Sequence, residues 1–581
     1  MKKNYYKIIG AICVVSGFTS CADFLEIKPQ NEIILEDFWN EKADVDNIVA
    51  GCYSALQGDG VRRRMMVWGE VRSDNVQAGS NVQNEDLNLY NVLRENINAK
   101  NSYTNWDGFY DVINRCNTVI KYAPGVAAID PGYTEGDLKA TIAEVSALRD
   151  LCYFYLIRTF RNVPYSTEAF TDDNQKMDLP ATPFETVLDS LISDLERVKG
   201  DAVSRYPENK PRYQTGRITR NAIYAMLCEM YLWKKDYDNC IKYAEMVTKE
   251  LKDMEEENRS KSSRFNSQST IEARLNGFPL ENDAITGNYF GDAYEAIFVK
   301  GASKETIFEL NYDNSPSTSG MLSNSAVQAM FGSSSTSGFL KPSTLVMEDI
   351  TSTTNRTIFE DANKMIDSRL YSNCSTDDEQ VVKMAVRSLT IDATNTSSPK
   401  MSGSLYAKDN NSSQWIIYRL PDIMLLEAEA LCQQMIEGSD SAVIETNKPL
   451  LEKAFRLVNA INKRSICKAI LTDADTLKPG NYNTKSLMEG LVMRERQREL
   501  MFEGKRYYDL VRYSLRDGNT STIINAVTNR DDVNKSYVPN FFKKMDAIFW
   551  PYNNEEMKVN SNLEPNPAFG SGESTSMEKA K

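Results

Sequence analysis

The sequence predicts a mainly α-helical protein whose middle region is rich in loops and contains a little β-structure. Helical periodicity recurs over 38–250 and again over 418–515. Between these blocks, residues 253–415 are dominated by Ser, Thr, Asn, Asp and Gly. One hairpin in the first block has the spacing of a tetratricopeptide repeat. We therefore expect helical pairs beside a loop-rich, minor-β face.

The first twenty residues are predicted to be a secretory signal and not part of the fold. Three lysines lie within positions 2–7, and the apolar run from Ile8 to Phe18 is too short to span a bilayer. Two small residues then precede Cys21, as in bacterial signals whose cysteine becomes acylated. We expect Cys21 to be the lipidated N-terminus, since several acyl chains anchor a protein stably. The alternative is an ordinary cleaved signal with an incidental cysteine.

The N-terminal block, 38–250, carries the most regular helical pattern. Helices are expected near 41–57, 105–122, 136–160, 183–198, 217–235 and 238–250. In the hairpin at 216–247, Cys228 and Cys240 occupy the positions where two antiparallel helices come closest. Their Cα atoms would then lie within disulfide reach, about 4.4–6.8 Å. Two buried thiols would fill the space equally well, so the sequence leaves this bond open.

The remaining chain is predicted in three parts. Within 253–415, short β-type runs occur at 296–299 and 306–310. The C-terminal block, 418–515, should form helices at 421–437, 449–464 and 485–515. A second, degenerate hairpin is split between 423–432 and 454–461, and Pro421 should fix a helix start. Residues 516–581 form an irregular tail.

An apolar stripe in the last helical segment continues into carboxylates. Leu487 and Leu491 are followed at i+4 steps by Glu495, Glu499 and Glu503. Buried carboxylates must be paired, and the nearby cations are Arg494, Arg498 and Arg506. We interpret the run as a structural ion-pair network. A general acid/base site built from two of these glutamates is the functional alternative.

Composition excludes several classes of activity. The 581 residues include no histidine, which removes Ser-His-Asp and Cys-His nucleophile pairs and His-ligated zinc. The net charge of −14 makes nucleic acid an unlikely partner. The cysteines show no metal-type spacing. We expect no catalytic residues, no cofactor and no metal ligands.

Several motifs together resemble the SusD/RagB family, the lipid-anchored surface nutrient-binding proteins of Bacteroidetes. They are the opening CADFLEIKP at 21–29, WDGFYDVINRCN at 106–117, EVSALR at 144–149, RITRNA at 217–222, YRLPDI at 418–423, RERQRELMFEGKRYYDLVR at 494–512, FWP at 549–551 and PNP at 565–567. These motifs occur in the family's order. The sequence departs from the family at Pro421, where Ala is more common, and at Arg161-Asn162, where Gly-Asp is common.

The resemblance implies a single domain over 21–581 and a binding function. Family members sit on the outer membrane facing the exterior, capture oligosaccharides or in some lineages peptides, and work with a SusC-like TonB-dependent transporter. They have no catalytic residues to carry over. Two other classes stay open: a lipid-anchored glycoside hydrolase that uses two carboxylates, and a helical-repeat adaptor without a small ligand. Sugar affinity without turnover would distinguish the transporter-associated binding protein from both the hydrolase and the adaptor.

A glycan site requires exposed aromatic rings with amides and carboxylates around them. Trp39, Trp106, Trp233 and Trp550 lie in periodic or family-like segments and are predicted to be core. The remaining loop aromatics suggest a site shared by the first loop region and the start of the middle region. The predicted ligand contacts are Trp68, Asp74, Asn75, Tyr90, Tyr289 and Tyr294. A loop-anchoring role is the alternative for each ring.

Overall fold

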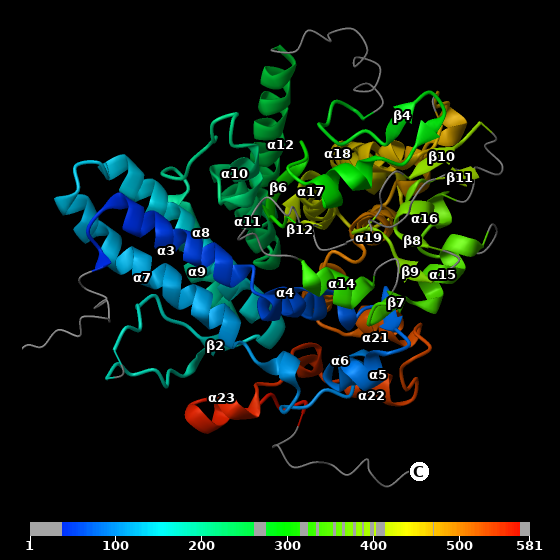
Figure 1. Cartoon of the computed structure of the whole chain (residues 1–581). Coiled ribbons are helices and arrows are strands. Elements are labelled where there is room, and N and C mark those ends of the chain that lie inside the picture. The colour runs from blue at the N-terminus through cyan, green and yellow to red at the C-terminus, as the bar shows by residue number, and fades with distance from the viewer. Residues whose placement is uncertain are drawn as a thin grey trace, which may run out of the picture.

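A computed structural model describes residues 38–569, with gaps at 173, 261–274, 314–323, 333–335, 353–355, 363–366, 376–378, 386–388, 395–399, 403–412 and 469. The predicted signal segment and Cys21 lie outside the described residues. The protein is mostly helical (Figure 1). The mainly α-helical fold class is thus confirmed.

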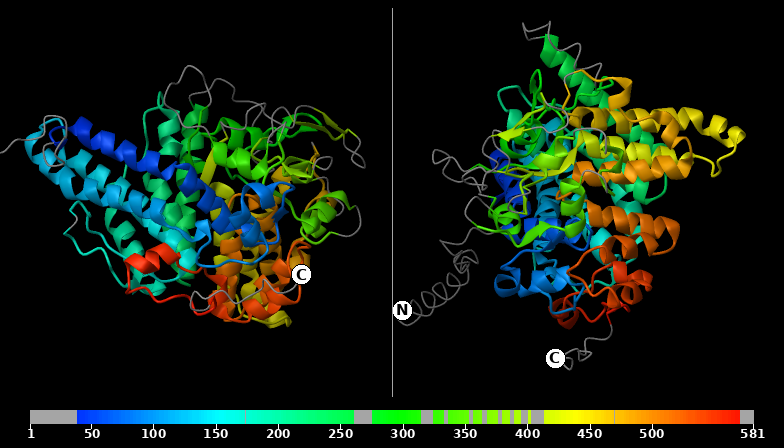
Figure 2. Two further views of the ribbon diagram at one scale, coloured as in Figure 1. Left: turned by 60° about the horizontal axis from the view of Figure 1, so that its bottom comes forward. Right: turned by 90° about the vertical axis from the view of Figure 1, so that its right-hand side faces the viewer.

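The helices of the N-terminal block form a layered row. They are α3 (Lys42–Leu56), α4 (Asp59–Met66), α5 (Val82–Glu85), α6 (Leu87–Leu93), α7 (Asp107–Ile129), α8 (Glu135–Phe160), α9 (Phe184–Val198), α10 (Pro211–Gly216), α11 (Arg220–Trp233) and α12 (Tyr237–Ser260). Helix α3 packs on α7, α7 on α8, α8 on α9, and α9 on α11, which pairs with α12. The blue and cyan members of this row run side by side (Figures 1 and 2).

The C-terminal block extends the same row. It contains α17 (Leu420–Gln434), α18 (Ser441–Ser465), α19 (Lys485–Leu500), α20 (Arg506–Asp517), α21 (Ser521–Thr528), α22 (Tyr537–Phe542) and α23 (Asn554–Val559). Helix α12 packs on α17, α17 on α18, and α19 on both α17 and α18. Pro421 lies in the first turn of α17, as predicted. Three helices in the tail show that it is less irregular than expected.

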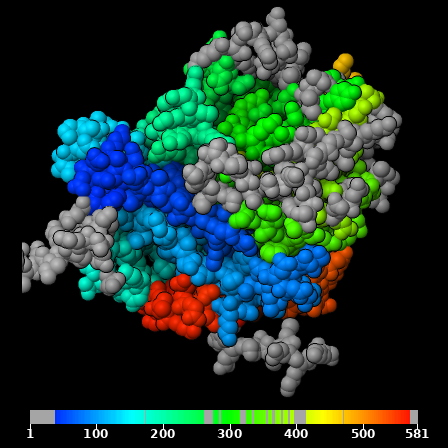
Figure 3. Space-filling view, in the orientation of Figure 1, coloured from blue at the N-terminus to red at the C-terminus, as the bar shows by residue number. Residues whose placement is uncertain are grey.

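The middle region contributes short helices and small antiparallel sheets. The helices are α14 (Ser325–Phe331), α15 (Thr344–Thr351) and α16 (Arg369–Ser372). The strands along the chain are β1 (Val76–Ala78), β2 (Val163–Pro164), β3 (Ala181–Thr182), β4 (Ala284–Thr286), β5 (Tyr289–Phe290), β6 (Thr306–Leu310), β7 (Leu340–Pro342), β8 (Cys374–Ser375), β9 (Gln380–Val381), β10 (Thr390–Asp392), β11 (Lys400–Ser402) and β12 (Trp415–Arg419). Strands β11, β10, β5 and β4 form one sheet, and β1–β7, β2–β3, β6–β12 and β8–β9 form pairs. In Figure 3 this green region shares a face with the blue N-terminal helices.

The predicted elements differ from the observed ones in informative places. The run 296–299 lies in a π-helical turn, Glu295–Lys300, and is not a strand, whereas 306–310 is strand β6. The single helix expected over 485–515 is broken between α19 and α20, where Phe502 has φ of 70° and Gly504 has φ of 71°. In the second hairpin, the two predicted parts are 423–432 and 454–461. Most of the segment between them is also helical, since α18 begins at Ser441.

The hairpin of α11 and α12 packs as its spacing predicts. Cys228 and Cys240 are fully buried, and their Sγ atoms lie 3.7 Å apart. Both are free thiols in this structure. The close approach of the two helices is confirmed, and the two small thiols fill the interface without a covalent bond.

Candidate functional site

A strained corner of the helical row lies at the end of α8. Arg161 has φ of 69° and ψ of −75°, and the N–H of Asn162 donates to the Phe160 carbonyl at 3.0 Å. This is a γ-turn of the rare type, which a residue with a Cβ adopts at a cost of about 1–3 kcal/mol. Such strain persists only where surrounding contacts impose it, and it concentrates at ligand-binding sites.

The C-terminal tail supplies the contacts that hold this corner. Arg161 Nη1 donates to Asp546 Oδ1 at 2.8 Å, and its guanidinium lies 5.7 Å from the Phe549 ring centroid. Tyr552 donates its hydroxyl to the Asn162 carbonyl at 2.6 Å. Burial, and then the Glu564 carboxylate, raise the pKa of Tyr552 to about 12. Tyr552 therefore remains a neutral donor at neutral pH.

Two adjoining hollows open around Arg161, each of about 360 Å³. Arg161 and Phe549 line both hollows. The first also contains Asn162, Asp546, Tyr552, Asn562 and Asn566, and the second contains Phe184, Trp233, Lys234 and Lys235. We call the two together the Arg161 groove.

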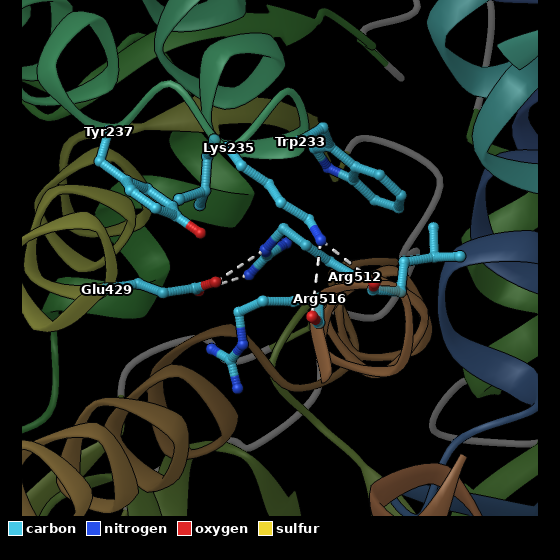
Figure 4. A pocket seen from close by; sticks show the side chains of 8 residues that line it. Trp233, Lys235, Tyr237, Glu429, Arg512 and Arg516 are labelled. Atoms are coloured by element: carbon cyan, nitrogen blue, oxygen red, sulfur yellow. Dashed lines mark hydrogen bonds and ion pairs between the residues drawn. The ribbon is translucent and has the colours of Figure 1, made fainter. Parts of the chain in front are cut away.

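A small cavity continues from the second hollow beneath Trp233 (Figure 4). In this cavity, Arg512 donates to Glu429 at 2.6 and 2.9 Å. Lys235 Nζ donates to the carbonyls of Leu515 and Arg516 at the end of α20. The indole N–H of Trp233 has no partner. With a volume of about 20 Å³, the cavity has room for about one water molecule.

The groove combines buried rings with a polar rim. Trp233, Phe549 and Tyr552 are 1–6% exposed and form its floor. The side chains of Arg161 and Asp546 are 43% and 39% exposed. Amides and a charged pair above an apolar floor suit a ligand with many hydroxyls. Because the rings are covered, we expect polar contacts to dominate over stacking.

Known proteins identify the family of this chain. A protein-family model described as the SusD family matches residues 304–569. A second family model, described as starch-binding and associating with the outer membrane, matches residues 23–232. The chain belongs to the SusD/RagB family. The SusD-like protein P38 of Formosa agariphila is 26% identical over 85% of this chain and 88% of the relative. The SusD-like protein P2 of the same organism is 23% identical over 97% and 99%.

Solved structures agree with this assignment at the level of fold. A SusD homolog from Bacteroides thetaiotaomicron has a TM-score of 0.61 at 17% identity, with 92% of this chain and 98% of that chain covered. A structure described as a laminarin-binding SusD-like protein has a TM-score of 0.58 at 17% identity, with 91% and 100% covered.

Most of the predicted ligand contacts of this SusD-family chain are buried. Trp68 is fully buried in the π-helical turn Val67–Val71, where it stacks on Phe109 at 4.9 Å and donates to the Tyr103 carbonyl at 2.8 Å. Tyr294 is 3% exposed, and its ring lies 5.0 Å from Lys383 Nζ. The prediction that these rings are exposed is therefore wrong, and neither can stack on a ligand as the structure stands.

The two predicted polar contacts are also core residues. Asp74 Oδ1 and Oδ2 accept from Arg506 at 2.9 and 3.0 Å. Asn75 donates to Glu70 at 2.8 Å and accepts from Gln497 at 2.8 Å. Both residues join the N-terminal segment to the C-terminal block. Their expected exposure was wrong because Arg506 and Gln497, which cover them, lie more than 400 residues away in sequence.

Tyr90 and Tyr289 reach the surface but on separate elements. Tyr90 is half-buried on α6, where its hydroxyl accepts from Arg94 Nη1 at 3.3 Å. Tyr289 is 43% exposed on β5, opposite Asp392 of β10. In Figure 1, α6 lies in the lower half of the view, whereas β4 lies at its upper right. The structure thus does not bring these two rings into one site.

The three glutamates of the C-terminal stripe form the expected buried ion-pair network. Glu495, Glu499 and Glu503 are at most 3% exposed. Arg498 pairs with Glu495 as predicted, but Arg494 pairs with Asp361 and Arg506 with Asp74. Arg369, Arg419, Arg464 and Lys383 supply the other cations, all from outside the segment. The hydrolase alternative loses its proposed carboxylates, because burial and pairing keep them from a substrate.

The described residues offer little for other chemistry. In this part of the chain, no three His, Cys, Asp or Glu residues are placed to hold a metal ion. None of the described helices has both the length and the apolar composition that crossing a membrane requires.

Proposed function

We propose that this SusD-family chain is a lipid-anchored protein of the cell surface that binds oligosaccharide and passes it to a SusC-like TonB-dependent transporter. The observation that carries the proposal is the match of two SusD-type family models to both ends of the chain. The laminarin-binding relative supports a glycan as ligand. A peptide or another nutrient is the alternative ligand on the same architecture.

Glycan binding is tested first with a glycan array and the non-lipidated mature chain. We expect saturable binding to one class of oligosaccharide and no release of shorter products. Binding only to peptides would select the alternative ligand, whereas turnover would select a hydrolase. Co-purification of a TonB-dependent transporter with the lipidated protein from solubilised outer membranes tests delivery. Absence of the transporter in several mild detergents would contradict that part of the proposal.

The anchor is tested by Cys21→Ala. We expect the variant to leave the outer-membrane fraction while its melting temperature is unchanged, because a terminal segment adds little packing. Fractionation followed by immunoblotting measures this. The variant's persistence in the outer membrane would show that another feature attaches the protein.

We propose the Arg161 groove as the glycan site, and Arg161→Gly tests it. Glycine adopts φ of 69° without strain, and the lost ion pair is largely exposed and worth little. The melting temperature should therefore stay equal or rise. Affinity for the glycan identified by the array should fall at least about tenfold, as expected for a central contact. Calorimetry and thermal unfolding give the two values.

The matched control is Glu379→Gly. Glu379 also has a left-handed backbone, with φ of 49°, and pairs with an exposed cation, Lys341, at 2.7 Å. It lies outside the groove, so its loss should relieve strain without changing affinity. Tyr90→Ala and Tyr289→Ala test the site first expected on the loop face. If those two variants lose affinity and Arg161→Gly does not, the groove assignment is wrong.

A further inference from the structure

Another hollow, separate from the Arg161 groove, lies in the helical row. It shares no lining residue with that groove. It has a volume of about 390 Å³ and lies between α12 and α18, with Glu427 of α17 in its wall. Phe278, from the loop that follows the α11–α12 hairpin, forms another part of the wall. We call it the Phe278 hollow.

The loop that carries Phe278 is fixed to α18 by reciprocal hydrogen bonds. Asn276 Nδ2 donates to the Arg456 carbonyl at 3.2 Å, and Arg456 Nη2 donates to the Asn276 carbonyl at 3.0 Å. Phe278 itself is 8% exposed. The ring is thus a mostly buried part of the wall, next to α18.

Two cations share this ring without a carboxylate partner. Lys252 Nζ lies 4.5 Å and Arg456 Cζ 5.8 Å from the ring centroid. Neither side chain forms an ion pair with any described residue. Burial, and then the charge of Arg456, lower the pKa of Lys252, and they outweigh the Glu427 and Glu256 carboxylates, which act to raise it. The two charges therefore repel each other, and an anion between them would relieve that repulsion.

The other charged groups of the hollow are largely neutralised among themselves. Lys453 pairs with Glu245 at 2.6 Å and with Glu427 at 3.0 Å. Lys249 pairs with Asp253 at 2.6 Å. Glu256, on the exposed rim, forms no ion pair with Lys252 in the structure. Unpaired cations stand out in a chain whose net charge is −14.

A buried hydroxyl completes the lining. Thr248 is 8% exposed and lines the hollow one turn before Lys252 on α12, and its Oγ1 has no hydrogen-bond partner among the described residues. A threonine in a helix normally donates to the carbonyl four residues earlier. Because Oγ1 is itself covered, Thr248 forms part of the wall and does not contact a ligand in the hollow.

We propose that the Phe278 hollow binds an oxyanion, the carboxylate or sulfate ester of an acidic ligand. Lys252 and Arg456 supply the two positive charges. Pairs of cations bind such groups through charge-assisted hydrogen bonds. The site is independent of the Arg161 groove and of the transporter.

The test follows the lysine side chains directly. Lysines of the non-lipidated mature chain are dimethylated with ¹³C, which keeps their charge, and the Lys252 signal is assigned from its loss in Lys252→Gln. Sulfate or acetate then replaces chloride at constant ionic strength. We expect a saturable shift of the Lys252 signal. Stronger binding of sulfate than of acetate or glucuronate would identify a sulfate ester, and the reverse order a carboxylate; glucose should not bind.

Variants separate the site from general charge effects. Calorimetry should show at least about tenfold weaker anion binding in Lys252→Gln and Arg456→Gln. Lys249→Gln, one turn away and already paired with Asp253, should bind as the wild type does. A Lys252 signal that does not saturate, or that shifts no more than the other lysine signals, would overturn the proposal. So would unchanged affinity in Lys252→Gln.

Discussion

Replacing Arg419 by methionine should lower the free energy of unfolding by about 3–5 kcal/mol, the usual loss when one partner of a buried ion pair is removed. Arg419 donates to Glu499 Oε1 at 2.6 Å and to the two Glu503 carboxylate oxygens at 2.6 and 2.8 Å. It also donates to the Glu499 carbonyl at 2.7 Å. All three side chains are at most 3% exposed. Methionine fills much of the space, but among the described residues it leaves Glu503 paired with Lys383 alone.

The control for this variant is Arg115→Met. Arg115 pairs with Asp111 at 3.0 Å on the surface of α7, and the two side chains are 48% and 52% exposed. The loss should be no more than about 0.5 kcal/mol, because solvent screens an exposed pair. Urea unfolding of both variants measures the difference. Equal losses in the two variants would mean that the buried network adds no more than a surface pair.

The network also predicts how stability depends on pH. Burial alone would raise the pKa of Glu499, but Arg464, Arg419 and Arg369 outweigh it and hold that pKa well below its usual range. A carboxylate with a lowered folded-state pKa stabilises the fold above its unfolded pKa, about 4.3. This stabilisation is lost as pH falls below that value. The melting temperature of the wild type should therefore fall more steeply than that of Arg419→Met between about pH 5 and 3.

Local patterns in the sequence were sufficient for most helices but not for the tertiary partners of individual residues. The predicted helices 41–57, 136–160 and 183–198 agree with α3, α8 and α9 to within one residue at each end. Their apolar spacing and caps are local signals, which is why the sequence predicts them. Pairing of Glu499 was also predictable, since a carboxylate on a buried stripe requires a cation. The identity of its cations was not, because they lie 35 to 130 residues away.

The candidate site shows the same limit. Trp68 was predicted to be exposed because no regular pattern surrounds it, yet it lies in a π-helical turn beneath Tyr103 and Phe109. Arg161 was visible only as a departure from the family's usual glycine. Its φ of 69° explains why glycine suits the position. An arginine at a position where the family usually has glycine was the sequence signal that could have located the groove.

The contact between the N-terminal segment and the α19–α20 connection should be equally sensitive. Gly69 lies in the turn Val67–Val71, and a Cβ on it would lie 1.9 Å from the Gly504 carbonyl oxygen and 2.5 Å from the Gly504 carbonyl carbon. Glu70 holds the two segments together by accepting from the N–H groups of Phe502 and Gly504 at 2.9 and 3.1 Å. The chain around Gly504 therefore cannot move away without loss of these bonds.

Gly69→Ala should thus lower the free energy of unfolding by about 3 kcal/mol or more, at the upper end of the range for overpacking, because the added carbon meets backbone and not a flexible side chain. Gly125→Ala is the control: it lies in α7 with no atom within 4 Å of the added carbon. That variant should gain up to about 1 kcal/mol, because alanine favours a helix over glycine. Urea unfolding of both variants measures the two changes. A loss in Gly69→Ala no larger than about 1 kcal/mol would show that the two segments can separate freely, and that Glu70 does not fix their distance.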